Sequence, residues 1–149
     1  MRRAFLCGRS ENFDFEHRRG WIVHRLKQLA AVFCIDIAAY AVMSNHYHVV
    51  LRINQETCNG LSDDEVIDRW RQLFKGPYLI QQYASGAVLV DEELQVVGDI
   101  TADWRKRLMD ISWFMRCLNE YIARLANKED NCTGRTDSGH LWPSALRAS

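Results

Sequence analysis

Residues 40–51 are rich in Val, Leu and Tyr, and they carry His46 and His48 two positions apart. Side chains alternate between the two faces of a β-strand, so both imidazoles project to the same side. The residues that anchor the strand point to the other side: Tyr47, Val49 and Leu51. Two adjacent imidazoles suit a divalent metal ion. The alternative is a strand with two polar residues on its wet face, and the spacing alone leaves both interpretations open.

The chain on either side of the histidines predicts an antiparallel hairpin. Residues 35–43 are rich in Ala and Ile and favour one strand, and residues 46–53 favour a second. Ser44 and Asn45 form the turn between them, because Asn tolerates left-handed backbone geometry and bonds its own backbone. The polar segment that follows, residues 54–60, predicts a loop.

Apolar spacing predicts helices on both sides of this hairpin. Residues 14–32 carry apolar side chains at intervals of four and three residues, which is typical of an amphipathic helix. Ser62 and Glu65 form a capping box that opens a second helix, which extends to about Phe74. With an antiparallel sheet covered by helices, the fold class that we predict is α+β.

A third and longer helix is predicted from Thr101, as its N-cap, to about Asn127. Its apolar stripe is regular: Leu108, Ile111, Met115, Leu118, Ile122 and Leu125. We expect this stripe to lie in the core, and dimerisation along it is the alternative. Residues 78–100 show no clean period, although residues 78–80 can form a short helix.

The string Met-x-Asn-His-x-His at residues 43–48 follows an Ala-Tyr-Ala-Val strand and resembles the histidine–hydrophobe–histidine signature of the single-tyrosine transposases. It is most similar to the REP-associated tyrosine transposases, which act on repetitive extragenic palindromes. Further segments resemble the same family in the same order: residues 2–8, 15–19 and 110–116. The likeness spans roughly residues 2–135, and the histidine string is its most specific part.

The resemblance implies a ferredoxin-like fold, usually acting as a homodimer, that binds single-stranded hairpin DNA. It implies that His46 and His48 hold a Mg²⁺ or Mn²⁺ ion, which polarises the scissile phosphate as a Lewis acid. In that family a tyrosine hydroxyl then attacks the phosphorus and forms a 5′-phosphotyrosine link. The implied activity is DNA transposition by metal-dependent cleavage and strand transfer.

The chain departs from the family pattern at both ends. The family's nucleophile lies in a late helix that also supplies the third metal ligand, and no segment here matches that helix. We therefore expect a transposase-like domain at residues 1–135 and a divergent tail without fixed structure at residues 136–149, such as a frameshift produces. Relatives also have a strand before Arg2 and Arg3, so we expect a sheet without its first and last strands and with exposed edges.

Tyr121 is the candidate substitute for the missing nucleophile. Residues 119–124 superficially resemble the family's nucleophile segment, although they precede the Gly-Arg landmark at residues 134–135. The alternative for Tyr121 is a helix-surface or half-buried aromatic residue. Tyr40 and Tyr47 also lie near the histidines, and we expect both to pack, because alternation turns Tyr47 away from them.

The formal net charge of the chain is +0, with 19 basic and 19 acidic residues, which weighs mildly against DNA binding. The basic residues are unevenly distributed, and a polarised surface can still follow phosphates. The alternative is a set of ordinary solvated helix faces. The candidate DNA contacts are Arg2, Arg3, Arg18, Arg19, Arg105, Lys106 and Arg107.

The chain's 5 cysteines are dispersed without a Cys-x-x-Cys pair, which argues against a zinc knuckle and a disulfide framework. We expect them to be reduced and packed. No apolar run reaches the length of about 18 residues that a membrane helix needs, and no signal peptide is apparent. We therefore expect a cytoplasmic protein with no membrane partner.

Three functions remain open at this point. The first is single-strand DNA cleavage and strand transfer, as the family resemblance implies. The second is a catalytically inactive, truncated relative that only binds DNA, which the absent nucleophile segment favours. The third is a metal-binding structural domain without a nucleic-acid role, which the neutral net charge favours.

Overall fold

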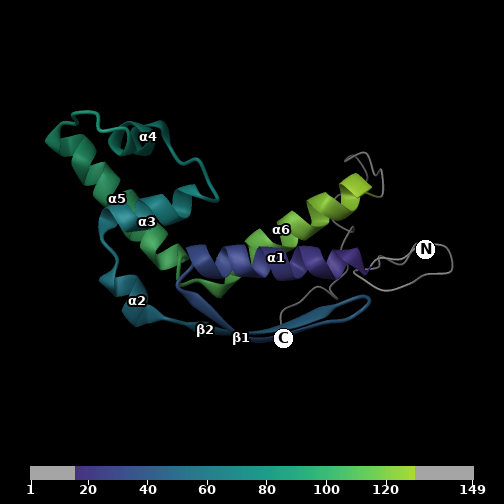
Figure 1. The fold of residues 1–149 in the computed structure, drawn as a ribbon. Helices are drawn as coiled ribbons and strands as arrows, with labels where there is room; N and C mark the ends of the chain where they lie inside the picture. The colour runs from purple at the N-terminus through teal and green to yellow at the C-terminus, as the bar shows by residue number, and fades with distance from the viewer. Residues whose placement is uncertain (1–15, 130–149) are drawn as a thin grey trace.

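Helices pack on one face of a single β-hairpin in the computed structural model, which describes residues 16–129 (Figure 1). The elements, in chain order, are α1 (His17–Val32), β1 (Ile35–Val42), β2 (Tyr47–Ile53), α2 (Gln55–Gly60), α3 (Asp63–Arg71), α4 (Tyr78–Ala84), α5 (Asp91–Arg107) and α6 (Ile111–Glu129). The described chain is α+β with an antiparallel sheet, as predicted. The predicted tail at residues 136–149 lies outside the described residues, as does the start of the helix predicted over residues 14–32.

β1 and β2 pair antiparallel and confirm the predicted hairpin. Its turn contains Ser44 and Asn45 and is closed by the Met43 amide, which donates to the His46 carbonyl oxygen at 2.8 Å. Tyr47 and Val49 are buried on the inner face, whereas Val50 on the outer face is exposed. Within residues 16–129 the sheet has only these two strands, so each strand has one edge without a strand partner.

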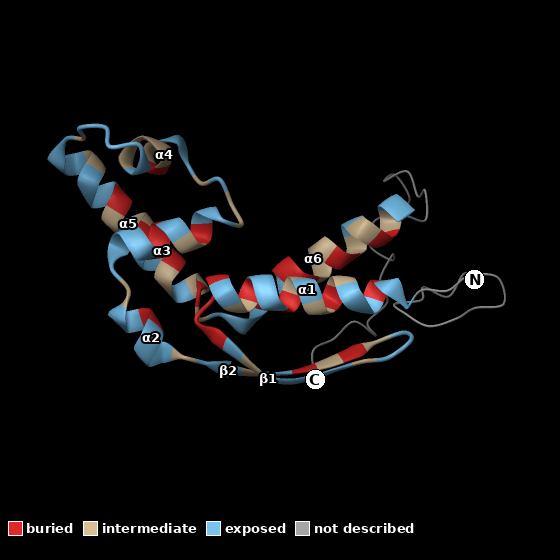
Figure 2. Cartoon of the chain, viewed as in Figure 1, coloured by how far each residue is buried: buried red, intermediate tan, exposed pale blue. Residues whose placement is uncertain are grey.

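α1 and α6 form the layer that buries the inner face of the hairpin (Figure 2). The two helices pack through apolar side chains that are almost fully buried: Ile22, Leu26 and Leu29 from α1, and Phe114, Leu118 and Ile122 from α6. At the far end, buried Arg18 donates from Nε to Glu129 Oε2 at 3.0 Å. This charge-assisted bond joins the first turn of α1 to the last turn of α6.

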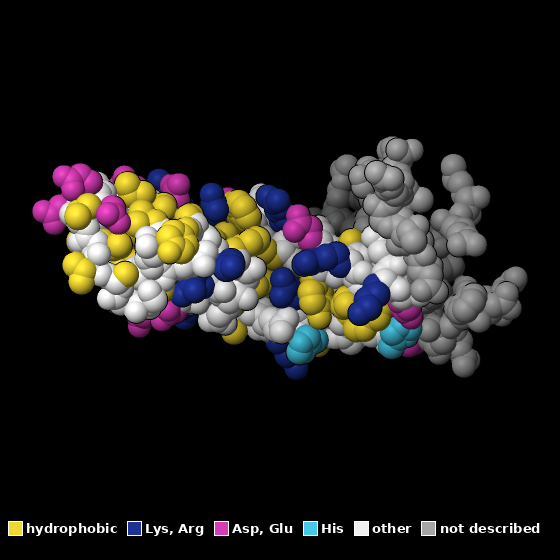
Figure 3. Space-filling model, turned by 90° about the horizontal axis from the view of Figure 1, so that it is seen from above, with side chains coloured by type: hydrophobic (Ala, Val, Ile, Leu, Met, Phe, Trp, Pro, Cys, Tyr) yellow, Lys and Arg dark blue, Asp and Glu magenta, His cyan; other side chains and the backbone are white. Residues whose placement is uncertain are grey.

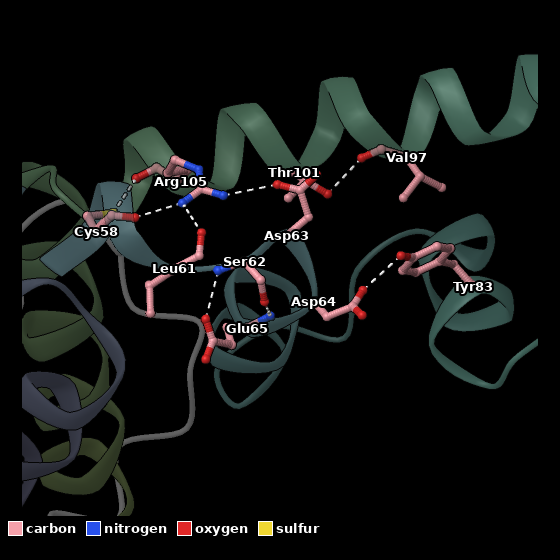
Figure 4. A network of polar contacts seen from close by, with 10 residues as sticks. All are labelled: Cys58, Leu61, Ser62, Asp63, Asp64, Glu65, Tyr83, Val97, Thr101 and Arg105. Atoms are coloured by element: carbon pink, nitrogen blue, oxygen red, sulfur yellow. Dashed lines mark hydrogen bonds and ion pairs between the residues drawn. The ribbon is translucent and has the colours of Figure 1, made fainter.

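α3, α4 and α5 form a helical lobe beside the hairpin (Figure 1). Arg105 fastens the chain between α2 and α3 onto α5 (Figure 4). Its Nη1 donates to the carbonyl oxygens of Cys58 at 2.7 Å and Leu61 at 2.8 Å, and its Nη2 donates to Asp63 Oδ1 at 3.0 Å. One guanidinium thus satisfies two backbone carbonyls at helix ends and pairs with a carboxylate.

The capping box predicted at the start of α3 is confirmed, because Ser62 Oγ accepts from the Glu65 amide and the Glu65 carboxylate accepts from the Ser62 amide. The loop predicted at residues 54–60 is wrong, because most of it forms the short helix α2. Asn54 caps α2 by accepting a hydrogen bond from the Thr57 amide at 3.1 Å. The polar residues of segment 54–60 include this N-cap, so they mark the start of a helix and not a loop.

The predicted start of a helix at Thr101 is also wrong. α5 begins at Asp91, where three acidic residues favour the positive end of the helix dipole. Thr101 is buried inside this helix, and its hydroxyl donates to the Val97 carbonyl oxygen at 2.7 Å (Figure 4). A threonine whose hydroxyl donates to the preceding turn can lie in a helix interior, so Thr101 does not act as an N-cap here.

The long helix predicted to Asn127 is two helices that meet at Asp110. The Asp110 carboxylate accepts from the Ser112 amide at 2.7 Å and from the Trp113 amide at 3.4 Å, which caps α6. Four members of the predicted stripe are buried, whereas Ile111 is exposed and Leu125 is half-buried. The stripe is therefore mostly core, as expected, but it continues around a corner between α5 and α6.

The cysteines that the structure describes are free and buried, as predicted: Cys34, Cys58 and Cys117. Burial raises the pKa of Cys34 to about 12, which keeps its thiol protonated and inert near neutral pH. Cys7 and Cys132 lie outside the described residues.

We expect Gly76→Ala to destabilise the chain by at least about 1–2 kcal/mol. Gly76 has a φ of +80° in the turn between α3 and α4, and a Cβ there would lie 2.8 Å from the Trp104 ring. Urea unfolding measures the cost. Gly98→Ala is the control, because nothing lies within 4 Å of its added methyl group, and in a helix it should be neutral or stabilising by up to about 1 kcal/mol. Equal stability of the two variants would contradict the close approach at Gly76.

We expect Leu118→Ala to reduce the free energy of unfolding by roughly 2–5 kcal/mol, because its side chain is fully buried between α1 and α6. Leu94→Ala removes the same atoms from an exposed site on α5 and should cost far less. Chemical denaturation of both variants tests the placement, and similar losses would show that α6 does not bury this face.

Candidate functional site

His46 and His48 project from the outer face of the hairpin, as alternation predicts. Their ring centres lie 5.2 Å apart with the planes at 87°. A metal–nitrogen bond of about 2.1 Å places the ring centres of two imidazoles on one ion roughly 5 Å apart. The separation of the two rings therefore fits two ligands of a single ion.

The hairpin turn also fixes which nitrogen of His46 is able to bind a metal. The Asn45 side-chain oxygen lies 2.6 Å from His46 Nδ1. An amide oxygen only accepts, so this contact places the ring proton on Nδ1 and leaves the lone pair of Nε2 free. Asn45 lies in the turn, as predicted, and acts there on its neighbour's side chain. Such an outer contact orients a metal-binding imidazole.

Tyr47, between the two histidines, anchors this strand to the helices. Its side chain is 1% exposed, and its hydroxyl donates to Asn119 Oδ1 of α6 at 2.5 Å. Burial raises the pKa of the Tyr47 phenol well above its usual value. Because the buried phenol cannot turn outward without losing this bond, the two flanking imidazoles are held outward.

The two imidazoles have no third protein ligand in the described part of the chain, where no group of three His, Cys, Asp or Glu side chains is placed to hold a metal ion. Ions such as Mg²⁺ usually keep several waters and take further oxygens from phosphates. An ion held by this pair would take its remaining ligands from outside the described residues.

Tyr121 lies away from the histidines. It is half-buried on α6, and the guanidinium carbon of Arg25, from α1, lies 4.6 Å from its ring centre. Arg25 Nε is buried with no hydrogen-bond partner among the described residues, and burial lowers the pKa of this guanidinium. Since α6 covers the inner face and the imidazoles leave the outer face, the structure does not bring Tyr121 to the histidine pair.

The other tyrosine near the pair, Tyr40, is only half packed. It is 50% exposed, although it pairs across the hairpin with buried Val49. Tyr40 lines a groove of about 360 Å³ between α1 and β1, together with Val23 and Lys27. The expectation of packing is therefore met by Tyr47 and only partly by Tyr40.

The residues predicted to contact DNA have different environments. Arg18 and Arg105 hold elements together through the bonds to Glu129 and to the α2–α3 segment. Arg107 lies over indole rings, with its guanidinium carbon 4.6 Å from the Trp113 ring centre. Arg19 and Lys106 are exposed. Arg2 and Arg3 lie outside the described residues.

Sequence analysis missed an aromatic cluster where α3, α5 and α6 meet. The Trp70 ring centre lies 4.8 Å from that of Phe74 in a stacked arrangement and 5.4 Å from that of Trp113. Trp104 completes the cluster at 6.1 Å from Trp70. The signal in the sequence was the presence of three tryptophans between residues 70 and 113. Because they are far apart along the chain, the sequence did not indicate that they contact one another.

Comparison with protein-family models, curated proteins and solved structures finds no match to this chain. Among the described residues, no helix combines the length and the apolar character needed to cross a membrane.

We expect Tyr47→Phe to lower stability by about 1 kcal/mol at neutral pH, because the bond to Asn119 is lost. The variant should also change the pH dependence. The unfolded phenol ionises near pH 10, whereas the folded one stays protonated, so this group's contribution to wild-type stability falls as the pH rises above about 10. The variant should lack that part of the fall.

Urea unfolding at neutral pH and at high pH measures both effects, with Tyr78→Phe as the control because Tyr78 is exposed. Identical pH profiles for Tyr47→Phe and the wild type would contradict the burial of this hydroxyl.

Proposed function

We propose that this chain binds single-stranded hairpin DNA, with a Mg²⁺ or Mn²⁺ ion between the histidine pair and a backbone phosphate. The single observation that carries the proposal is the geometry of His46 and His48, whose ring centres lie 5.2 Å apart on one face. The resemblance of residues 43–48 to the REP-associated tyrosine transposases supplies the class of ligand. The dimer and the ferredoxin-like fold implied by that resemblance belong to the same proposal.

A bound divalent ion supplies positive charge and Lewis acidity at a phosphoryl oxygen. The chain contributes its position: Tyr47 fixes the strand, Asn45 fixes the tautomer of His46, and the two imidazoles project together from the outer face. Two nitrogen ligands favour Mn²⁺ over Mg²⁺, because imidazole is a softer ligand than carboxylate or water.

The cations expected to assist binding are few. Lys106 and Arg19 are exposed, whereas Arg18 and Arg105 are committed to bonds within the fold. Each phosphate that a single-strand binder neutralises contributes about −0.7 to the slope of log affinity against log salt. We therefore expect hairpin binding that weakens with salt along a shallow slope.

DNA cleavage through Tyr121 is not part of this proposal. A phosphotyrosine link needs the phenol beside the phosphate that the metal polarises. Tyr121 packs against Arg25 on the inner side of the hairpin, and the histidines lie on the outer side. The arrangement supports a DNA-binding relative of the transposases more than a transferase that uses Tyr121.

We expect Mn²⁺ to tighten binding of a single-stranded hairpin by about tenfold over EDTA, a change of about 1.4 kcal/mol, because the ion joins the imidazoles to a phosphate. Gel-shift titration at low salt measures this ratio. His46→Ala with His48→Ala should abolish the gain, and His24→Ala, which removes an exposed imidazole from α1, should keep it.

Two results would contradict this account. If the double variant keeps the Mn²⁺ effect, the histidines do not hold the ion. If the wild type binds no hairpin at low salt, the nucleic-acid role fails and a metal-binding structural domain is the better description. A covalent protein–DNA adduct that forms with the wild type and not with Tyr121→Phe would instead show that Tyr121 cleaves DNA.

A further inference from the structure

A small pocket opens at the junction of α3, α5 and α6, remote in sequence from the hairpin. Its volume is about 320 Å³. The walls come from the aromatic cluster and from the second half of α5, and the turn at Gly76 and Pro77 borders it. The size lies at the lower end of small-molecule sites, which suits one ligand group of the size of a nucleotide.

Aromatic rings supply flat apolar surface to this pocket. Phe74 and Trp113 are only half-buried, and their ring centres lie 5.9 Å apart edge-to-face. Trp70 and Trp104 form the buried floor beneath them. The two half-exposed rings are perpendicular, so a flat ring that stacks on one meets the other edge-on. The Arg107 and Arg116 guanidinium groups lie over Trp113, so Phe74 offers the surface for stacking.

Arg107 brings a positive charge to the same pocket without a carboxylate partner. Its guanidinium carbon lies 4.6 Å from the Trp113 ring centre and 5.7 Å from that of Trp70. It forms no hydrogen bond or ion pair among the described residues, even though Asp103 lies one turn earlier on α5. Charges four residues apart can pair on a helix, and here Asp103 and Arg107 do not, which leaves a donor and an acceptor at one pocket.

Asp103 provides the matching acceptor. Its side chain is exposed, lines the pocket and has no hydrogen-bond partner in the described part of the chain. A carboxylate has two oxygens and can accept two parallel hydrogen bonds. Among the bases, guanine offers two such donors side by side on its Watson–Crick edge, at N1 and at the exocyclic amine.

We propose that this pocket binds an unpaired guanine of single-stranded DNA. The base stacks on Phe74 and meets Trp113 edge-on, its Watson–Crick edge donates to Asp103, and its phosphate lies against Arg107. This inference rests on the proposed function and adds to it a second contact, which reads one base. Base–aromatic stacking of this kind is a general device for holding unpaired bases.

The surroundings of the pocket suit a phosphate backbone. The Arg116 guanidinium carbon lies 5.0 Å from the Trp113 ring centre, so a second cation adjoins the pocket, although its Nε also pairs with Glu120 at 2.9 Å. Figure 3 shows Lys and Arg side chains interleaved with hydrophobic ones across the middle of the face seen from above, with acidic side chains gathered at its left end. A proline-rich peptide also docks on aromatic grooves, but it brings no phosphate for Arg107.

The test compares oligothymidylate with the same strand carrying one central guanine, by fluorescence anisotropy at low salt in EDTA, so that the histidine pair holds no ion. We expect the guanine strand to bind the wild type about tenfold more tightly. Replacing the guanine by hypoxanthine removes the exocyclic amine and should reduce this preference.

Asp103→Ala should abolish the preference while the protein remains folded, because Asp103 is exposed and has no described partner. Asp99→Ala removes the same charge one turn away on α5 and should raise affinity for both strands equally, leaving their ratio unchanged. Phe74→Ala should weaken binding of both strands by about 5- to 100-fold. If that variant unfolds, the ratio measured with Asp103→Ala decides.

A preference that is absent from the wild type, or that Asp103→Ala retains, would overturn the guanine pocket. Mn²⁺-dependent hairpin binding would then persist and leave the proposed function standing. A wild type that binds neither strand nor the hairpin would overturn both proposals.

Discussion

The burial of Tyr47 and Val49 against α1 and α6 is the interaction on which the candidate site depends. It decides which face of β2 enters the core, and alternation then leaves His46 and His48 on the other face. A shift of one residue in the pairing would bury the imidazoles and expose the phenol. The bond from the Tyr47 hydroxyl to Asn119 reinforces this register, because the buried donor has a partner only in this arrangement.

The helical lobe depends on a second polar contact, the guanidinium of Arg105. It satisfies the carbonyl oxygens of Cys58 and Leu61 at the C-terminal end of α2 and pairs with Asp63, which holds α3 against α5. The cap at Asp110 then turns the chain into α6 and brings Trp113 to Trp70. The aromatic pocket is a consequence of these two contacts, because its walls come from three helices that they position.

Local patterns predicted much of this arrangement. The alternation in residues 46–53 gave the hairpin and the direction of both histidines, and the Ser62–Glu65 pair located the start of α3. The errors arose where tertiary contacts override local signals. Thr101 is a good N-cap residue, but inside α5 its hydroxyl bonds to Val97, and the stripe that suggested one helix crosses a bend at Asp110.

The site was harder to predict than the fold, because partners distant in sequence decide what each side chain does. Arg18 and Arg105 look like surface cations in the sequence, yet each bonds to residues far along the chain. Nor could the sequence indicate that Tyr121 would face Arg25 of α1. Only the histidine pair could be located directly, since its geometry follows from the two-residue period of a strand.

Pulsed electron paramagnetic resonance of Mn²⁺ bound to the purified chain tests the central claim most directly, because it detects nitrogen nuclei bonded to the ion. The account predicts imidazole nitrogen couplings in the wild type and in His24→Ala, and their loss when His46 and His48 are both replaced by Ala. Couplings that survive this double replacement, or a wild-type spectrum that shows only water ligands, would contradict it.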